Sequence, residues 1–395
     1  MPVLLAAAGF LLVGLDGSVN IAFPAMSAAF RVGPTTMRWV IIYYVGTYAL
    51  TAFAAGVLAD RFGPGRVVRA GLVLSLFCFA AYALVSSLEI FLLVRVLQGV
   101  SAGLILGAAP ALVTLSLPSS RHAWGLGWAS MGLGLGLTVG PLIGGALVGA
   151  FGWRGAFLYR VPVAAGFIVL AAWTREARRD GRGAWRMVAP ADILRWPVLQ
   201  AGLLTFLANY AQFAVWLLAP FYLVGQRGLS AAAAGVLFML MPLATAVAAP
   251  VAGRATDRWG PRGPMAAGLA AEAAGLLLVA RCGGSTPIAL VGAALALVGL
   301  GLGVFQVPNI AQAMAAFPPR QQGAAGGFAF LSRTAGIVVG VQTAAWLFHD
   351  RAQILGFLPA FRFTFAAAAA VCALAALVAL VPGRERAPRA TRHEA

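Results

Sequence analysis

Long runs of apolar residues, separated by short polar loops, are the feature that most limits how this chain can fold. About 20 mostly apolar residues are enough for one helix to cross the hydrocarbon core of a bilayer. The runs cover residues 3–26, 37–59, 67–87, 90–115, 124–150, 156–173, 197–224, 231–253, 264–281, 286–314, 322–347 and 358–381. The sequence therefore predicts an all-α integral membrane protein with about twelve transmembrane helices.

Composition excludes the soluble classes of protein. Apolar residues make up 61% of the chain and charged residues only 10%, whereas a soluble domain is about one quarter charged. The net charge of +17 comes from 28 basic residues, all of them Arg, which are dispersed among the loops. That dispersion is typical of membrane topology and of contact with anionic lipid head groups, so we expect membrane lipids and no nucleic acid as partners.

Neither a metal site nor an enzyme active site is indicated. The three cysteines lie in or at the edge of apolar runs, at Cys78, Cys282 and Cys372. Their scattered, odd-numbered pattern fits packing rather than disulfides or metal ligands. The three histidines are expected in loops or the tail, at His122, His349 and His393. No nucleophile–base or phosphate-binding pattern accompanies them, so we expect no cofactor and no catalysis.

The distribution of arginine predicts orientation. One set of alternate loops holds about eighteen arginines and the other about seven, so the richer side and both termini should be cytoplasmic. Met1 leads almost directly into the first run, and a cleaved signal peptide is not expected. The longest polar stretch divides the spans six and six. The predicted parts are an N-terminal bundle at 1–173, a cytoplasmic linker at 174–196, a C-terminal bundle at 197–381 and a basic cytoplasmic tail at 382–395.

An internal repeat supports two six-helix halves. GVLADRFGP at 56–64 recurs as GRATDRWGP at 253–261, each after the second span of its half. The candidate latch residues are Gly56, Asp60, Arg61, Gly63 and Arg66 in the first copy and Gly253, Asp257, Arg258 and Gly260 in the second. Gly permits close helix approach, Asp can cap a helix N-terminus and Arg can bridge to an acid. Such a cluster could latch one conformation; the alternative is a charged turn that obeys the positive-inside rule.

The fifth span carries a ridge of small residues. Gly136, Gly140 and Gly144 recur every fourth residue, and Pro141 and Gly145 accompany them. The glycines predict tight helix contact and the proline a kink, which together suit a hinge or seal. A simple packing ridge is the alternative.

Four of the charged residues inside predicted spans are candidates for proton coupling. Asp16 and Glu272 are candidate proton carriers, because apolar surroundings favour the neutral acid and so allow it to alternate with the charged form. Asn20 lies one turn beyond Asp16 on the same face. Arg95 and Arg333 are candidate partners of an acid, and Arg333 also of an anionic substrate. The alternatives are a packing hydrogen bond for Asp16, an ion pair or a lipid-facing position for Glu272 and snorkelling for Arg95.

Polar and aromatic residues of several spans are candidates to line a substrate cavity. They are Asn20, Tyr43, Tyr44, Tyr48, Gln98, Asn209, Tyr210, Gln212, Trp216, Gln306, Asn309 and Gln312. A largely apolar, aromatic cavity would suit bulky hydrophobic or amphipathic molecules. The alternative is hydrogen bonding between helices.

These motifs resemble the major facilitator superfamily, and within it the drug:proton antiporters. GVLADRFG, RVLQG at 95–99 and VGPLIGG at 139–145 resemble its motifs in the second loop, fourth helix and fifth helix. Three further segments resemble the subfamily usually built with about fourteen helices, here shortened to about twelve: LDGSVNIAFP at 15–24, GWRGAFLYRVP at 152–162 and GGFAFLSRTAGIVVG at 326–340.

The resemblance implies roles for particular residues. Asp60 and Arg61 would stabilise the outward-facing state, Arg95 would assist proton coupling and the fifth helix would keep exchange coupled. Two positions depart from the family pattern. Asp16 precedes Asn20 by four residues instead of the usual five, which turns it by about 100° on a helix, and Arg160 replaces the family's Asn.

We therefore expect a multi-pass protein of the cell membrane, acting as a monomer. Its expected activity is export of a hydrophobic or amphipathic small molecule, a drug or secondary metabolite, in exchange for protons. An uptake or facilitative transporter of the same fold is the main alternative, and a non-transporting membrane sensor is a third.

Overall fold

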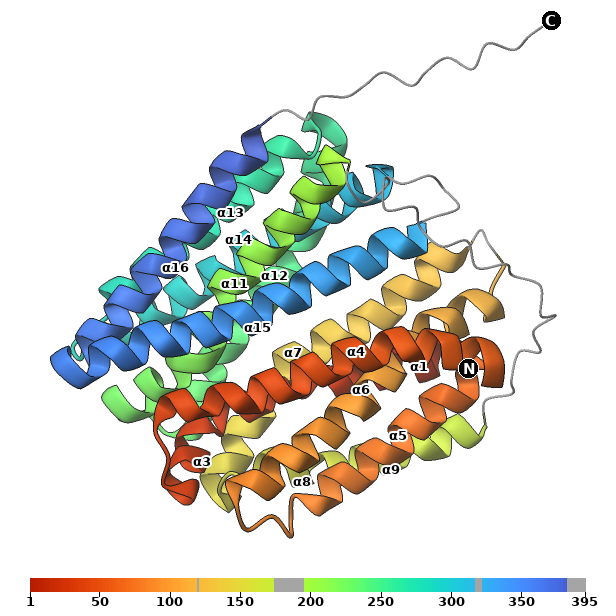
Figure 1. Ribbon diagram of the computed structural model, residues 1–395, viewed down its shortest axis with the longest axis horizontal. Helices are drawn as coiled ribbons and strands as arrows, with labels where there is room; N and C mark the ends of the chain where they lie inside the picture. Colours follow the sequence, from red (N-terminus) through yellow and green to blue (C-terminus); the bar gives the residue numbers. More distant parts are fainter. Residues whose placement is uncertain (119–120, 174–194, 317–321, 382–395) are drawn as a thin grey trace, which may run out of the picture.

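The computed structural model describes the chain except for residues 119–120, 174–194, 317–321 and 382–395 (Figure 1). Within these described residues the chain is helical and contains no strand. Twelve of its helical segments are long and apolar enough to cross a membrane. The predicted all-α membrane protein with twelve spans is therefore confirmed, while the cytoplasmic location of both termini stays a prediction.

The helices form two groups that follow each other along the sequence. The first group comprises α1 (Pro2–Gly14), α2 (Gly17–Ile21), α3 (Phe23–Phe30), η1 (Pro34–Met37), α4 (Arg38–Phe62), α5 (Pro64–Ala81), α6 (Leu88–Ser116), α7 (His122–Phe151), α8 (Gly155–Leu158) and α9 (Arg160–Ala172). The second comprises α11 (Trp196–Phe221), η3 (Tyr222–Gln226), α12 (Ala231–Trp259), α13 (Arg262–Arg281), α14 (Ile288–Ala316), α15 (Gln322–Leu355) and α16 (Phe357–Leu380).

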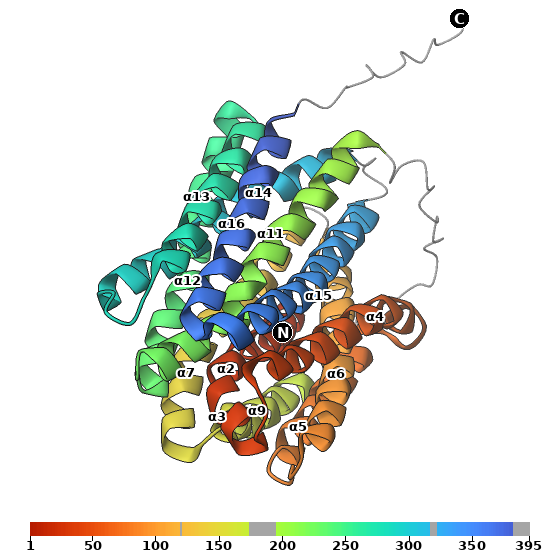
Figure 2. The same cartoon turned by 60° about the vertical axis from the view of Figure 1, so that its left-hand side comes forward.

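Each group packs mainly on itself, and the two meet along a limited interface. Its main contacts join α7 to α12 and α4 to α15. Figure 1 shows α4 and α15 running side by side, and Figure 2 shows the same two groups from another direction. The ranges assigned to the two bundles, the linker and the tail remain predictions, because 174–194 and 382–395 lie outside the described residues.

The first span departs from the single helix expected over 3–26. It is divided at Leu15–Asp16 and again at Ala22 into α1, α2 and α3. At the first division the amide of Asp16 bonds to the carbonyl of Val13 at 3.1 Å and that of Val19 to the carbonyl of Asp16 at 3.0 Å, a tighter turn than an α-helix. The flanking glycines and the close approach of α7 favour this break. Asp16 thus lies at a break in the helix, so the rotation of about 100° expected for an uninterrupted helix does not strictly apply to it.

The glycine ridge of the fifth span makes the predicted tight contact. A Cβ added at Gly136 or Gly140 would meet the backbone of α1 and the following turn, and one at Gly144 would meet Ser18 of α2. Gly145 faces the opposite group, where its Cβ would meet the carbonyl of Ala231 in α12. α7 is therefore held against α1 and α2 on one side and against α12 on another.

The two repeated loops are helix ends, which corrects the idea that their aspartates cap helix N-termini. Asp60 lies in the last turn of α4 and Asp257 in the last turn of α12. The turns that follow use Gly63 (φ 89°) and Gly260 (φ 76°), a left-handed backbone that glycine adopts without strain. Neither α5 nor α13 has a side-chain cap at its N-terminus. The side chain of Asp60 lies outside the described part.

Two histidines expected in loops are helical. His122 begins α7, and His349 belongs to α15, which runs to Leu355 and past the predicted end at 347. The longer α15 results from polar residues that continue the helix beyond its apolar run. His393 lies outside the described residues.

Candidate functional site

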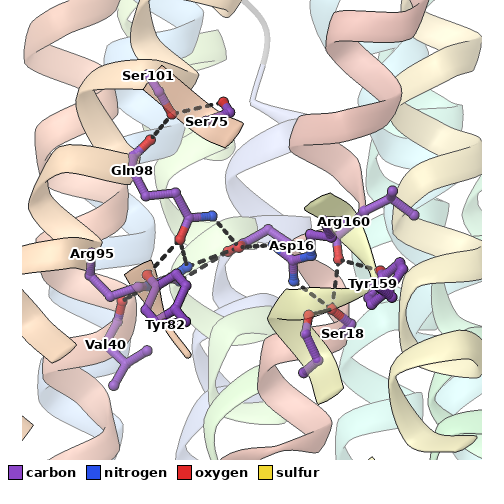
Figure 3. A network of polar contacts seen from close by, with 12 residues as sticks. Asp16, Ser18, Val40, Ser75, Tyr82, Arg95, Gln98, Ser101, Tyr159 and Arg160 are labelled. Atoms are coloured by element: carbon purple, nitrogen blue, oxygen red, sulfur yellow. Dashed lines mark hydrogen bonds and ion pairs between the residues drawn. The ribbon is translucent and has the colours of Figure 1, made fainter. Parts of the chain in front are cut away.

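The carboxylate of Asp16 is the centre of a network of charged and polar side chains (Figure 3). Arg95 of α6 binds it in a bidentate manner, with Nη1 2.9 Å from Oδ1 and Nη2 2.9 Å from Oδ2. Arg160, the first residue of α9, donates from Nη1 to Oδ1 at 2.9 Å. Gln98, one turn after Arg95, donates from Nε2 to Oδ1 at 2.9 Å. Both oxygens of Asp16 are thus engaged by donors from two other helices.

Arg95 is held in place by groups on its own helix and on α4. Its Nε donates to the carbonyl of Val40 at 3.1 Å, and its Nη1 also donates to Oε1 of Gln98 at 3.0 Å. The guanidinium carbon lies 4.2 Å from the centre of the Tyr44 ring, a cation–π contact. These contacts fix the planar fork of the guanidinium toward Asp16.

Arg160 is fixed by aromatic rings and by Ser18. Its guanidinium lies 5.3 Å from the ring centre of Phe79 and 5.4 Å from that of Phe157. Its Nη2 donates to Oγ of Ser18, which lies within 3.1 Å of the carbonyl of Ala156. The Nε of Arg160 is buried and has no hydrogen-bond partner among the described residues. This arginine is therefore less completely satisfied than Arg95.

Further hydrogen bonds link Gln98 to Tyr82 and, through Ser101, to Ser75 of α5. Tyr82 donates to Oε1 of Gln98 at 2.7 Å. Ser101 donates to the carbonyl of Gln98 at 2.7 Å and accepts from Ser75 at 3.0 Å. The network thereby links the break between α1 and α2 to α4, α5, α6 and α9.

The cluster is deeply placed and carries an excess of positive charge. The side chains of Arg95 and Arg160 are 2% and 0% exposed, and that of Asp16 is 13% exposed. Two guanidinium groups share one carboxylate, so the ionised acid is strongly stabilised. α2, which follows Asp16, contacts α7 of its own group and α11 and α12 of the other. Protonating Asp16 would leave two like charges side by side, so the contacts around it would have to change.

Glu272, the second candidate acid, lies in a different environment. It is wholly buried in α13, which packs against α12, α14 and α16. Neither carboxylate oxygen has a hydrogen-bond partner among the described residues, and the Cys372 thiol of α16 lies beside it. A Cβ at Gly301 of α14 would meet its backbone. The structure therefore separates Glu272 from Asp16 and encloses it among helices of the second group.

Several cavity candidates bond to neighbouring helices or to their own. Asn309 of α14 donates to Oγ1 of Thr205 at 2.7 Å, and Asn209 of α11 donates to the Thr205 carbonyl at 2.8 Å. Gln312 donates to Gln200 of α11 at 3.1 Å. This arrangement matches the alternative of interhelical hydrogen bonding for Asn309 and Gln312.

The remaining cavity candidates are dispersed. Trp216 is buried against Phe238, with ring centres 5.1 Å apart, and Gln212 approaches the sulfur of Met241 at 3.9 Å. Tyr43 is 41% exposed. Asn20, Tyr48, Tyr210, Gln306 and Arg333 are half-buried. Tyr48 of α4 contacts Phe330 of α15 at 5.8 Å between ring centres, across the interface of the two groups.

Sequence reasoning missed Arg160, Tyr82 and Ser18 as members of the cluster. Arg160 had one detectable signal, since it is an arginine inside an apolar run where the related family has Asn. Tyr82 and Ser18 had none, because a single hydroxyl in an apolar helix is common.

Comparison with known proteins agrees with this architecture. The Major Facilitator Superfamily model matches residues 5–199 and 201–395. The riboflavin transporter RibZ of Clostridioides difficile is 24% identical, with 84% of each chain covered. The drug efflux pump JefA of Mycobacterium tuberculosis is 27% identical over 88% of this chain and 81% of its own.

A solved structure shows the same fold. A bacterial homologue of the human lysosomal transporter Spinster, in an inward-facing and unoccupied conformation, superposes with a TM-score of 0.78 at 16% identity, covering 96% of this chain and 95% of that one. With the family model matched along nearly the entire sequence and twelve helices able to span a membrane, the chain belongs to the major facilitator superfamily of multi-pass membrane transporters.

Proposed function

We propose that this transporter exports a hydrophobic or amphipathic small molecule across the cell membrane in exchange for protons. The observation that carries the proposal is the sharing of the Asp16 carboxylate by Arg95 and Arg160 at a break in the first span. Ionisable groups are costly inside a membrane protein and mark proton or substrate pathways. The similarity to the drug efflux pump JefA supports export.

Protonation of Asp16 would couple to a change in helix packing. The ionised carboxylate ties the α1–α2 break to α6 and α9 through four hydrogen bonds at 2.9 Å. A neutral acid attracts the two guanidiniums far less, while their mutual repulsion remains. Proton binding therefore favours an arrangement in which these helices separate, and proton release favours the closed cluster. This difference in affinity is what a coupled transporter requires.

The interface between the two groups supplies the moving contact. Gly145 of α7 and Gly235 of α12 allow close approach of the backbones, and Tyr48 meets Phe330 between α4 and α15. In the proposed cycle these contacts form and break as the groups rock. The repeated helix ends with Arg61 and Arg258 would latch one of the two states. For Asp60 and Arg61, the resemblance implies that this is the outward-facing state.

The decisive test is transport by purified protein in proteoliposomes with an imposed pH gradient. The probes are rhodamine 123, fluorescein and the neutral dye Nile red. Gradient-driven accumulation should be abolished in Asp16→Asn and retained in Glu272→Gln, which alters a carboxyl outside the cluster. Elution of each variant as a single species from a sizing column would show that it remains folded.

Two results would change the proposal. Loss of transport in Glu272→Gln but not in Asp16→Asn would move the proton site to α13. Transport indifferent to the gradient in the unmodified protein would reject antiport in favour of facilitated diffusion.

A further inference from the structure

The acidic and basic side chains at the interface of the two groups are unequal in number. Arg95 and Arg160 share Asp16, and a third arginine, Arg333 of α15, lies half-buried on the opposite side of the interface. Tyr48 of α4 lies against Phe330 of α15, with ring centres 5.8 Å apart, and Phe330 is about one helical turn from Arg333. Arg95, Arg160 and Arg333 therefore bring three positive charges to the helices in and near this interface, and Asp16 brings one negative charge.

No other acid with a described side chain neutralises this region. Glu89, Asp257 and Asp350 are exposed near helix ends, and Asp350 pairs with Arg351 at 3.7 Å. Glu272 is enclosed in α13. Even an ionised Glu272 would leave the interior positive, so the sign of the charge does not depend on the protonation state of that residue.

Asp16 has little capacity left for a cationic ligand. Its Oδ1 already accepts from Arg95, Arg160 and Gln98, and its Oδ2 accepts from Arg95. A cation entering here would meet the charges of Arg95 and Arg160 and a carboxylate that is already engaged. Arg333, in contrast, has a buried Nε without a hydrogen-bond partner among the described residues. A buried donor of this kind favours an acceptor supplied by a ligand.

We infer that, given the exporter proposed above, its substrate is an anionic amphipath: a carboxylate or ionised phenol on an aromatic or apolar body. The acidic group binds Arg333, whose buried Nε has no hydrogen-bond partner among the described residues. The body lies against the rings of Tyr48 and Phe330, whose centres are 5.8 Å apart. Guanidinium recognises a carboxylate through paired, charge-assisted hydrogen bonds, which accounts for the selection of this class.

The test compares two dyes that share a xanthene–phenyl body but carry opposite charge, fluorescein and rhodamine 123. Their binding to the purified protein in detergent is measured by fluorescence polarisation without any pH gradient. Fluorescein should bind about tenfold more tightly than rhodamine 123. Arg333→Gln should weaken fluorescein binding by about tenfold, and Arg333→Lys, which keeps the charge, should restore part of it.

A matched control removes an arginine elsewhere. Arg281→Gln changes an exposed residue at the end of α13 and should leave fluorescein binding unaltered. Equal or tighter binding of rhodamine 123, absence of fluorescein binding, or fluorescein binding unaffected by Arg333→Gln would each overturn the inference.

The two proposals fail in different ways. Gradient-driven export of rhodamine 123 that requires Asp16, without fluorescein binding, would uphold the exporter and refute the anionic substrate. Fluorescein binding that requires Arg333, together with transport indifferent to the gradient, would uphold the binding site and refute antiport.

Discussion

Removing the charge of Asp16 should destabilise the protein more than removing its partner Arg160. Asp16→Asn leaves Arg95 and Arg160 buried, adjacent and without a counter-charge. Removing one partner of a buried ion pair lowers the free energy of unfolding by about 3–5 kcal/mol. Arg160→Asn should cost only about 1–2 kcal/mol, because Asp16 keeps its bidentate bond to Arg95 and an incompletely satisfied guanidinium is removed.

The double variant gives a sharper test than either single one. In Asp16→Asn/Arg160→Asn only Arg95 remains without a counter-charge, so part of the cost of the aspartate change disappears. The combined loss of stability should therefore be smaller than the sum of the single losses, by about 1–2 kcal/mol. This coupling energy reports the interaction of Arg160 with Asp16 directly.

Thermal unfolding of the detergent-solubilised protein, followed by the fluorescence of its 10 tryptophans, measures these differences. At about 2 °C per kcal/mol for a chain of this size, Asp16→Asn should unfold about 6–10 °C below the unmodified protein. An Asp16→Asn protein within about 2 °C of the unmodified one would refute the reasoning, as would strictly additive losses in the double variant.

Two further predictions concern glycines. Gly145→Leu places a side chain where α7 meets the carbonyl of Ala231, and overpacking of about 1–3 kcal/mol should reduce the rate of proteoliposome transport severalfold. Gly149→Leu should not reduce this rate, because the space around its Cβ is open. Equal transport rates in both variants would argue against a moving contact at Gly145. Gly63→Ala imposes backbone strain at φ 89° and should lower the free energy of unfolding by about 1 kcal/mol in the same unfolding assay. Gly56→Ala, on the open face of α4, should be neutral or stabilising. A Gly63→Ala protein as stable as the unmodified one would show that no such strain arises.

The sequence by itself determined the class of fold. The thickness of a bilayer sets the length of each apolar run, so the twelve spans can be counted from the order of the residues alone. The glycine spacing of the fifth span likewise predicted a close helix contact, because residues four apart share one face of a helix. These features are local, and each can be identified within about 25 residues of sequence.

The composition of the polar cluster was decided only by the tertiary structure. Arg95 and Arg160 are 79 and 144 residues from Asp16, and a pattern along one helix carries no information about which distant side chain it meets. The same limit made Asn309 a candidate for a cavity, although packing of α14 on α11 pairs it with Thr205. It also left both Asp16 and Glu272 as candidate proton carriers, since both are acids in apolar runs.

Packing distinguishes those two acids. Asp16 lies at a break in its helix, where two guanidiniums stabilise its charge and 13% of its side chain is exposed. Glu272 is enclosed by α14 and α16. Hydropathy depends on the residues of one segment, whereas the environment of a charge depends on how separate segments are rotated and aligned against each other.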